Sequence, residues 1–413
     1  MKKLSLSGII WSFLFFCMAC DHDPSSSPEG PKGELPRELT ASEIKLVEAD
    51  HAFSYDIFRR TVAYDTEKDN LMISPLSIST ALAMTLNGAN GETYESIRQT
   101  LRLQGMSQEE INEAFRSLIK LLISADPKVR IQIANSIWYR EGIPVKEGFI
   151  QRLKEHYGAE VGELDFSDPA SVTIINNWVE QNTEGLIKTI IEKIPGDMAM
   201  YLINALYFKG EWLYKFDKKD TRKADFFPES GEQIQVDMMS REGKFATYSG
   251  EDARLIELPY GDSLYTMSIL MPGDPKMPID RFISEEVTKT NLDAWRSNLH
   301  VIGNTQLKLP KFELKYELTY NNILKAMGMD IAFEEGMADF TGIATTPPLF
   351  IDNVKHKTHI RVDEEGTEAA AVTSVGIGIT SAPLPISVNR PFVFIVYEQT
   401  SGTNLFMGKV KRP

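Results

Sequence analysis

The order in which helical and strand periodicities follow one another constrains the fold of this chain more than any other feature. Apolar residues recur at helical spacing mainly in the first half, whereas strand-like runs dominate the second half. The stretches expected to be helical are 42–58, 77–87, 93–101, 108–123, 148–157, 171–183 and 319–327, and the expected strands are 129–139, 200–208, 253–259, 265–271, 305–309 and 391–398. This order, without a regular alternation of the two, predicts an α+β protein with large, mostly antiparallel sheets.

The 413-residue chain shows no internal repeat and no interdomain linker after residue 40. Length alone would favour two or three domains, although large mixed folds hold this many residues in one unit. We therefore expect a single domain over residues 41–413, preceded by two segments of a different kind.

The N-terminus resembles a bacterial lipoprotein signal. Lys2 and Lys3 precede an apolar run over 4–16, which is too short to span a bilayer as a helix. The run ends in Cys17-Met18-Ala19-Cys20, where a small residue precedes a cysteine. We expect a signal peptide over 1–19 and a lipid on Cys20, the first residue of the mature chain. A plain secretory signal cut nearby is the alternative.

Residues 20–40 are expected to form a flexible tether between the lipid and the domain, because the stretch 21–36 is rich in Ser, Pro and Gly. The protein would then be anchored in the outer membrane, at the cell surface or in the periplasm. Both cysteines of the chain lie in the N-terminal segment. The domain therefore has no cysteine to pair, and its stability must come from core burial.

Charge and motifs exclude several classes of function. The formal net charge is −14, which disfavours nucleic acid and anionic membrane surfaces as partners. The basic stretch 218–223 is interrupted by Asp220 and is interpreted as a solvated loop. No Gly-x-Ser-x-Gly elbow, His-Glu-x-x-His motif or phosphate-binding loop occurs, which disfavours a hydrolase. We expect no catalytic residue and no cofactor.

Two groups of residues are possible metal ligands by residue type, and the sequence favours a metal site at neither. His356 and His359 lie in a strand-like stretch, where residues three apart face opposite ways. A calcium loop at 363–365 is disfavoured as well.

The segment from Gly366 to Pro385 is patterned like a strand, although turn residues bracket it. Positions 367, 369, 371, 373, 375, 377 and 379 are apolar or threonine throughout, whereas the other face carries the only charge, Glu368. This period of two is typical of a half-buried strand. The run 369–371 is all alanine, which suits a segment that slides between two strands already packed together. On pattern alone, an ordinary edge strand or a surface helical turn remains open.

Several stretches resemble the serpin family, in the order in which serpins carry them. The run 362–371 resembles the hinge before the reactive-centre loop of inhibitory serpins, and 389–394 and 405–410 resemble the strands that follow that loop. Further serpin-like stretches are 70–78, 203–212 and 309–312, so the resemblance covers about residues 41–413. It implies the serpin fold: helices with three mostly antiparallel β-sheets and an exposed reactive-centre loop.

The resemblance also implies a mechanism. A target serine protease attacks the loop as a substrate, and the acylated loop then inserts into the central sheet with the enzyme still covalently attached. The cleaved residue of serpins usually follows the hinge glycine by fourteen positions, which predicts cleavage at Thr380-Ser381; counting back from Asn389 gives the same bond. The residues implied for the hinge and insertion are Glu364, Gly366, Thr367, Glu368, Ala369, Ala370, Ala371, Val372 and Thr373.

Supporting positions follow from the same resemblance. Ser74, Ser77, Asn204 and His356 match polar residues beneath the place where the sheet opens. Trp212, Lys311 and Glu364 match the region where insertion begins, with Lys311 and Glu364 as a candidate ion pair. For an isolated histidine such as His356, plain core packing is the alternative.

The loop chemistry indicates which proteases would be inhibited. No Lys, Arg, Phe, Tyr or Trp occurs between Arg361 and Arg390, so trypsin-like and chymotrypsin-like enzymes lack their preferred residue. Thr380 is small and suits the shallow pocket of elastase-like proteases, whereas Ile379 suits papain-like cysteine proteases. We expect a monomeric inhibitor. A non-inhibitory serpin, acting as a binding or chaperone-like surface lipoprotein, is the alternative, which the small hinge residues disfavour.

Overall fold

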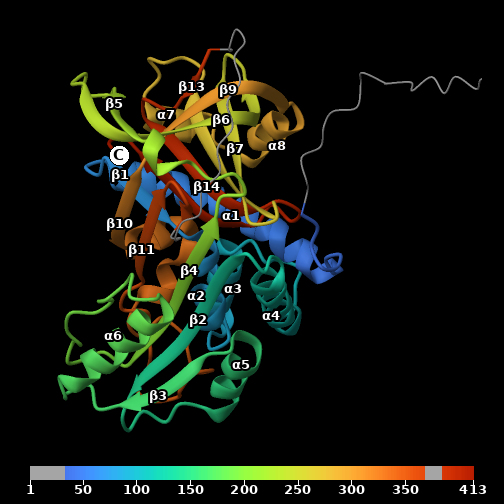
Figure 1. Cartoon of the computed structure of the whole chain (residues 1–413). Helices are drawn as coiled ribbons and strands as arrows, with labels where there is room; N and C mark the ends of the chain where they lie inside the picture. The colour runs from blue at the N-terminus through green and yellow to red at the C-terminus, as the bar shows by residue number, and fades with distance from the viewer. Residues whose placement is uncertain (1–32, 368–383) are drawn as a thin grey trace, which may run out of the picture.

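The computed structural model describes residues 33–367 and 384–413 (Figure 1). In this range the helices are α1 (Ala41–Tyr64), α2 (Pro75–Leu86), α3 (Gly91–Thr100), α4 (Gln108–Ser124), α5 (Glu147–Tyr157), α6 (Ala170–Asn182), α7 (Ile279–Glu285), α8 (Lys289–Ser297) and α9 (Asn321–Leu324), with the short turns η1 (Lys218–Asp220), η2 (Lys325–Met329) and η3 (Asp330–Phe333). The helices predicted in the first half are confirmed. The helix expected over 319–327 is instead the short α9 followed by η2, which Gly328 interrupts with a φ of 105°.

The strands in the same range are β1 (Asn70–Ile73), β2 (Val129–Arg140), β3 (Glu160–Leu164), β4 (Met200–Glu211), β5 (Arg222–Phe226), β6 (Ile234–Ser249), β7 (Ala253–Tyr260), β8 (Tyr265–Pro272), β9 (His300–Pro310), β10 (Phe312–Thr319), β11 (Lys355–Asp363), β12 (Gly366–Thr367), β13 (Ile386–Ser387), β14 (Phe392–Glu398) and β15 (Asn404–Val410). All six predicted strands are present. Pairing is antiparallel except between β2 and β3 and between β9 and β13, as the predicted mostly antiparallel sheets require.

The described strands form two sheets, where the resemblance implied three. One has the order β1-β15-β14-β8-β7-β6-β9-β13 with β5 paired to β6, and the other has the order β10-β11-β12-β4-β2-β3. The difference arises at β6, which is 16 residues long. Its beginning pairs with β5 and its end with β7, while β9 follows it across a bulge near Gly243. Two groups of strands are thereby joined by continuous hydrogen bonding into one sheet.

Local chemistry explains where the long helices begin. Thr40 caps α1 and Ser107 caps α4, each in a reciprocal capping box with a glutamate three residues later. Ser74 caps α2, whose first residue is Pro75, where a missing N–H costs nothing. The same cap also places Ser74 and Ser77 against the six-stranded sheet.

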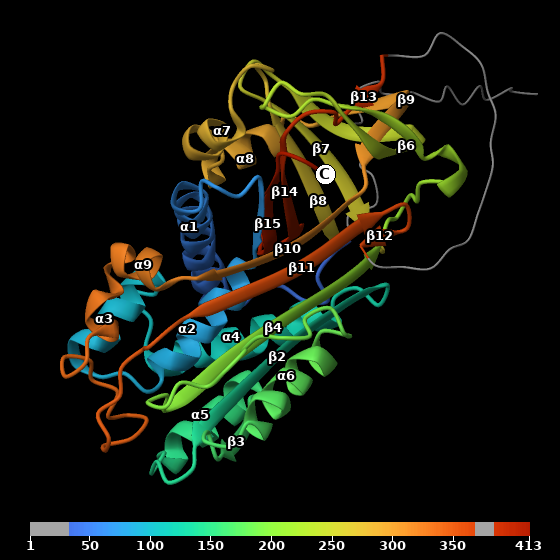
Figure 2. The same cartoon turned by 90° about the vertical axis from the view of Figure 1, so that its left-hand side faces the viewer.

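The six-stranded sheet is covered on both faces (Figure 2). On one face, Asn204 of β4 contacts Ser77 of α2. On the other face, Ile203 and Ala205 pack against α6 in a cluster that includes Trp178. Alternate residues of β4 therefore face opposite helices, as the strand period of two requires. In this sheet β4 and β11, which are far apart in the sequence, lie on either side of the very short β12.

Candidate functional site

The hinge is already a small hairpin. Glu364 and Glu365 form the turn between β11 and β12, and the two residues of β12 pair with β11 on one side and with β4 on the other. Gly366 has a φ of 147°, and a Cβ there would lie 2.1 Å from the carbonyl oxygen of Gly210. Glycine is therefore required at this position by both backbone conformation and space.

Thr367 is the last described residue before residue 384, and its side chain points into the protein. It is 2% exposed, and its hydroxyl lies 2.8 Å from the hydroxyl of Tyr260 on β7. Tyr260 in turn stacks on Trp212, with 4.3 Å between the ring centroids. The first residue of the expected inserting segment thus already occupies a place in the core.

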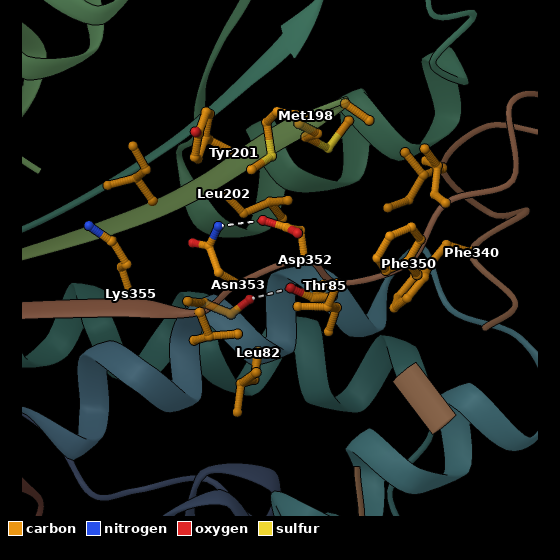
Figure 3. A pocket seen from close by; sticks show the side chains of 18 of the residues that line it. Leu82, Thr85, Met198, Tyr201, Leu202, Phe340, Phe350, Asp352, Asn353 and Lys355 are labelled. Atoms are coloured by element: carbon orange, nitrogen blue, oxygen red, sulfur yellow. Dashed lines mark hydrogen bonds between the residues drawn. The ribbon is translucent and has the colours of Figure 1, made fainter. Parts of the chain in front are cut away.

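Below β12 the sheet is open. Among the described strands, β11 and β4 each pair with β12 and with a neighbour on the far side, but not with each other. A cavity of about 340 Å³ lies here, lined by β4, the start of β11, α2 and the segment that precedes β11. Figure 3 shows Tyr201 and Leu202 of β4 above, Leu82 and Thr85 of α2 below, and Asp352 and Asn353 between them. We call this opening between β4 and β11 the slot.

An ion pair lies at the closed end of the slot. Lys311 Nζ is 2.9 Å from Glu364, whose side chain is 4% exposed, so the predicted pair is present. Burial alone would raise the pKa of Glu364. Hydrogen bonds from Lys311 and from the Thr221 hydroxyl outweigh burial, so the pKa lies below its ordinary value. The carboxylate is therefore charged and fully engaged at neutral pH.

Trp212 ties the same turn to β4. Its indole N–H donates to the carbonyl of Asp363 over 2.9 Å, and its backbone N–H donates to the carbonyl of Glu365 over 2.8 Å. Trp212, Lys311, Glu364, Gly366 and Thr367, which the sequence analysis grouped with hinge and insertion, are brought together here. We call them the hinge cluster.

The second predicted group meets halfway down the slot. The backbone N–H of Ser74 donates to His356 Nε2 over 2.9 Å, and the Ser77 hydroxyl donates to Asn204. Because Nε2 accepts this bond, the neutral ring carries its proton on Nδ1. Burial lowers the pKa of His356 to about 3, so the ring stays neutral. These four residues, the slot cluster, link α2 to both strands that border the opening.

Several predicted residues lie outside the described part of the chain: Cys20, Glu368, Ala369, Ala370, Ala371, Val372, Thr373, Thr380 and Ser381. Other contributors were missed by the sequence analysis. Tyr260 and Thr221 bind hinge residues, and Asn135 accepts a hydrogen bond of 2.7 Å from Asn204. For Asn135 the only signal in the sequence would have been a polar side chain in an otherwise apolar strand, whereas Thr221 lies between η1 and β5 and carries no such signal.

The described residues contain no cluster of three or more His, Cys, Asp or Glu side chains that could hold a metal ion. His356 and His359 do face opposite ways: His356 faces α2, whereas His359 lies 2.9 Å from Glu313 of β10. None of the helices in the described ranges is long and apolar enough to cross a membrane.

Comparison with known proteins decides the family. A family model described as Serpin (serine protease inhibitor) matches residues 48–413. The chain belongs to the serpin family. An uncharacterized serpin-like protein of Methanosarcina acetivorans is 32% identical, over 100% of this chain and 99% of its own length.

Solved structures agree with the serpin fold. The native state of tengpin, a thermophilic serpin, has a TM-score of 0.80 at 32% identity and covers 91% of this chain and 96% of its own. Human thyroxine-binding globulin in complex with its hormone has a TM-score of 0.81 at 27% identity, covering 90% of this chain and 100% of its own. Serpins are mostly inhibitors rather than catalysts, but the last comparison shows that the fold also serves ligand binding.

Proposed function

We propose that this serpin is a suicide-type inhibitor of serine endopeptidases, which traps the acyl-enzyme by inserting its reactive loop into the slot. The target's nucleophilic hydroxyl attacks the carbonyl carbon of Thr380, the bond to Ser381 breaks, and the Ser381 amine leaves with the proton. The remaining ester joins the enzyme to residues 367–380. Insertion of this segment then moves the enzyme away before water can hydrolyse the ester.

The register of β12 is the observation that carries this proposal. Gly366 and Thr367 lie opposite Asp363 and Val362 of β11, and opposite Glu211 and Gly210 of β4. Extended without a break, the same register would set residue 373 between His356 and Asn204, and residue 380 between Leu349 and Asp197. Residues 373–380 would thus run between the two walls of the cavity, which are formed by 197–204 on one side and 347–357 on the other.

The same register assigns the faces of the inserting segment. Thr367 points inward, so 369, 371, 373, 375, 377 and 379 would also point inward. These are the positions that are apolar or threonine throughout. Thr373 would arrive at the slot cluster, where polar groups can meet its hydroxyl, and the larger Val375, Ile377 and Ile379 would fill the cavity. Apolar surface would therefore enter where space exists for it.

The free energy available is sufficient for trapping. Each added net hydrogen bond contributes about 1 kcal/mol, and each buried Val or Ile adds about 1.5–3 kcal/mol. A dozen such contributions amount to roughly 10–20 kcal/mol, whereas slowing deacylation tenfold needs only about 1.4 kcal/mol. Residues 367–380 at about 3.3 Å each would carry the enzyme about 45 Å.

We propose elastase-like enzymes as the first targets, because Thr380 is small, and papain-like cysteine proteases as the second, because Ile379 precedes it. We also propose that the chain is anchored in the outer membrane through a lipid on Cys20, with 20–40 as a tether. The protein would act as a monomer, with the trapped protease as its partner.

The test is to incubate the protein from residue 21 onwards with an elastase, separate the products under denaturing conditions and determine the released peptide by mass. A complex that survives denaturation, with a peptide starting at Ser381, supports both the trap and the register. A panel in which only trypsin-like enzymes form complexes would overturn the proposed specificity.

The second candidate is a non-inhibitory serpin that binds a ligand, and the structural likeness to thyroxine-binding globulin favours it. Cleavage of the loop by every protease tested, with no stable complex, would support this alternative. The hinge argues for inhibition, because Gly366 and Thr367 already pair with both border strands and the three residues after Glu368 are alanine.

A further inference from the structure

The segment between β4 and β5 holds the hinge turn through three hydrogen bonds. Besides the two bonds of Trp212, the backbone N–H of Phe216 donates to the carbonyl of Glu364 over 2.9 Å. Three successive carbonyls, those of Asp363, Glu364 and Glu365, therefore receive donors from this one segment. The turn cannot move outward without breaking these contacts.

Charge adds a second constraint at Glu365. Its side chain is 3% exposed, and the cations close to it among the described residues are Lys218 at 2.6 Å and Lys215 at 3.9 Å. Lys218 is itself 60% exposed and lies on η1. The pairing raises the pKa of Lys218. A buried carboxylate is costly unless it is paired, so Glu365 depends on an exposed lysine.

We infer that Lys218 is a positioning residue for loop insertion: it keeps the Glu364–Glu365 turn, and with it Gly366 and Thr367, docked in the sheet. Without Lys218 the carboxylate of Glu365 would be left with Lys215 alone. An outward movement of the turn would rehydrate it, at the cost of the three hydrogen bonds from Trp212 and Phe216. Because Gly366 follows Glu365 directly, that movement withdraws β12 from between β11 and β4.

The consequence for inhibition rests on the proposed function. After cleavage, insertion and hydrolysis of the acyl-enzyme compete. When β12 is docked, insertion starts from Gly366 and Thr367, which are already paired with β11 and β4. When β12 is withdrawn, these two residues must first re-enter the sheet. Loss of Lys218 should therefore let more inhibitor be hydrolysed as a substrate for each enzyme trapped.

The first test measures hydrogen exchange of the amides over 363–367 in the uncleaved protein. Lys218→Gln should raise their exchange by roughly tenfold, as expected for loss of a charged partner to a buried group. Lys219→Gln is the matched control, because Lys219 is the next residue, is 56% exposed and pairs with Asp217 instead. Lys218→Arg should exchange like the wild type. Unchanged exchange in Lys218→Gln would overturn the inference.

A double variant shows whether the effect passes through Glu365. Glu365→Gln removes the buried charge, so in that background Lys218→Gln should no longer raise exchange. If Lys218→Gln has the same effect with and without the carboxylate, the inference is wrong.

The second test counts inhibitor molecules consumed per enzyme trapped, which should rise about threefold or more in Lys218→Gln but not in Lys219→Gln. An unchanged count together with faster exchange would overturn the link to insertion. If the wild-type protein traps no protease at all, the proposed function fails, whereas the exchange measurement still decides the role of Lys218.

Discussion

Single residues at the hinge shape the place that β12 occupies in the sheet. Gly210 of β4 pairs with Thr367, and the Gly210 carbonyl oxygen lies against Gly366; neither glycine leaves room for a side chain. A Cβ at Gly210 would lie 2.9 Å from the ring of Tyr260, whose hydroxyl is hydrogen-bonded to that of Thr367. Two glycines and one tyrosine therefore shape the entrance to the slot.

Gly366→Ala should convert the inhibitor into a substrate. Alanine at a φ of 147° is strained, and its Cβ would clash with the Gly210 carbonyl, so β12 should leave the sheet. Gly231→Ala is the control, because Gly231 has a φ of 81° but open space around it. The ratio of cleaved to complexed inhibitor should rise only in Gly366→Ala; an equal rise in both variants would contradict a specific role for the hinge.

His356 should make stability depend on pH. Its folded pKa of about 3 lies below the ordinary value of 6.5, so the stability it contributes is complete above pH 6.5 and is lost as the pH falls towards 3. Between pH 7 and pH 5 this loss is about 2 kcal/mol. Gln at 356 can still accept from the Ser74 N–H without titrating. Urea unfolding at both pH values should show that His356→Gln loses less unfolding free energy between pH 7 and pH 5 than the wild type does. An equal loss would show that His356 is not the group responsible.

At the scale of elements, α2 and its N-cap are hydrogen-bonded to both strands that border the slot. It reaches β4 through Ser77 and Asn204, and it reaches β11 through Ser74 and His356. Thr358 of β11 adds a hydrogen bond of 2.8 Å to the Met72 carbonyl of β1, just before α2. The two border strands are thus fixed to one helix rather than to each other, which lets them stay apart while the sheet remains ordered.

Ser77→Ala should loosen this arrangement. Asn204 loses a hydrogen-bond donor in a part-buried site, which costs roughly 1 kcal/mol of unfolding free energy. Ser124→Ala, which removes a hydroxyl that bonds only to carbonyls of its own helix, should change stability by less than about 0.5 kcal/mol. Denaturant titration of both variants checks this expectation, and equal effects would argue against a role for α2 in the slot.

Element patterns also explain what could be predicted from sequence. The helices of the first half begin within two residues of the predicted positions, and Thr40 and Ser107 give two of them clear caps, but α1 continues to Tyr64, well past the predicted end at residue 58. β10 was missed although its apolar and charged residues alternate cleanly from Phe312 to Thr319. β6 was missed for a physical reason: its outward face is charged and it bends at Gly243, so its pattern breaks.

The site could be predicted only in part, for a similar reason. The hinge and slot residues came from resemblance, and those that the structure describes meet in two clusters. Contacts between distant elements, such as that of Lys218 with Glu365, have no local signal, because they depend on how β4 and β11 lie in the sheet. The alternation of side chains over 367–379 could be predicted from the sequence. Which of the two sets would face the core followed only from the inward side chain of Thr367.

At the scale of the molecule, the six-stranded sheet is incomplete between β4 and β11 in the part of the chain that the structure describes. Its missing strand would come from the chain itself, and its place is marked by the register of β12 and by the cavity below it. On the proposed function, the form with this opening would be less stable than the form in which the loop fills it. Cleavage within the loop should therefore stabilise the protein, which is the reverse of what a break in a chain ordinarily does.

Thr367→Arg should separate cleavage from insertion. Residue 367 is 2% exposed, so an arginine would bury an unpaired charge at the first step. The variant should be cleaved by an elastase at the wild-type rate but form little stable complex on denaturing gels. Trapping at the wild-type ratio would contradict insertion.

The most direct measurement compares the unfolding of intact and loop-cleaved protein in guanidinium chloride. We predict that the cleaved wild type unfolds at a markedly higher denaturant concentration than the intact protein, since insertion adds roughly 10–20 kcal/mol of gross stabilisation. Cleaved Thr367→Arg should show no such increase. If the cleaved wild type unfolds at the same concentration as the intact protein or below it, the loop does not enter the sheet and the central claim is wrong.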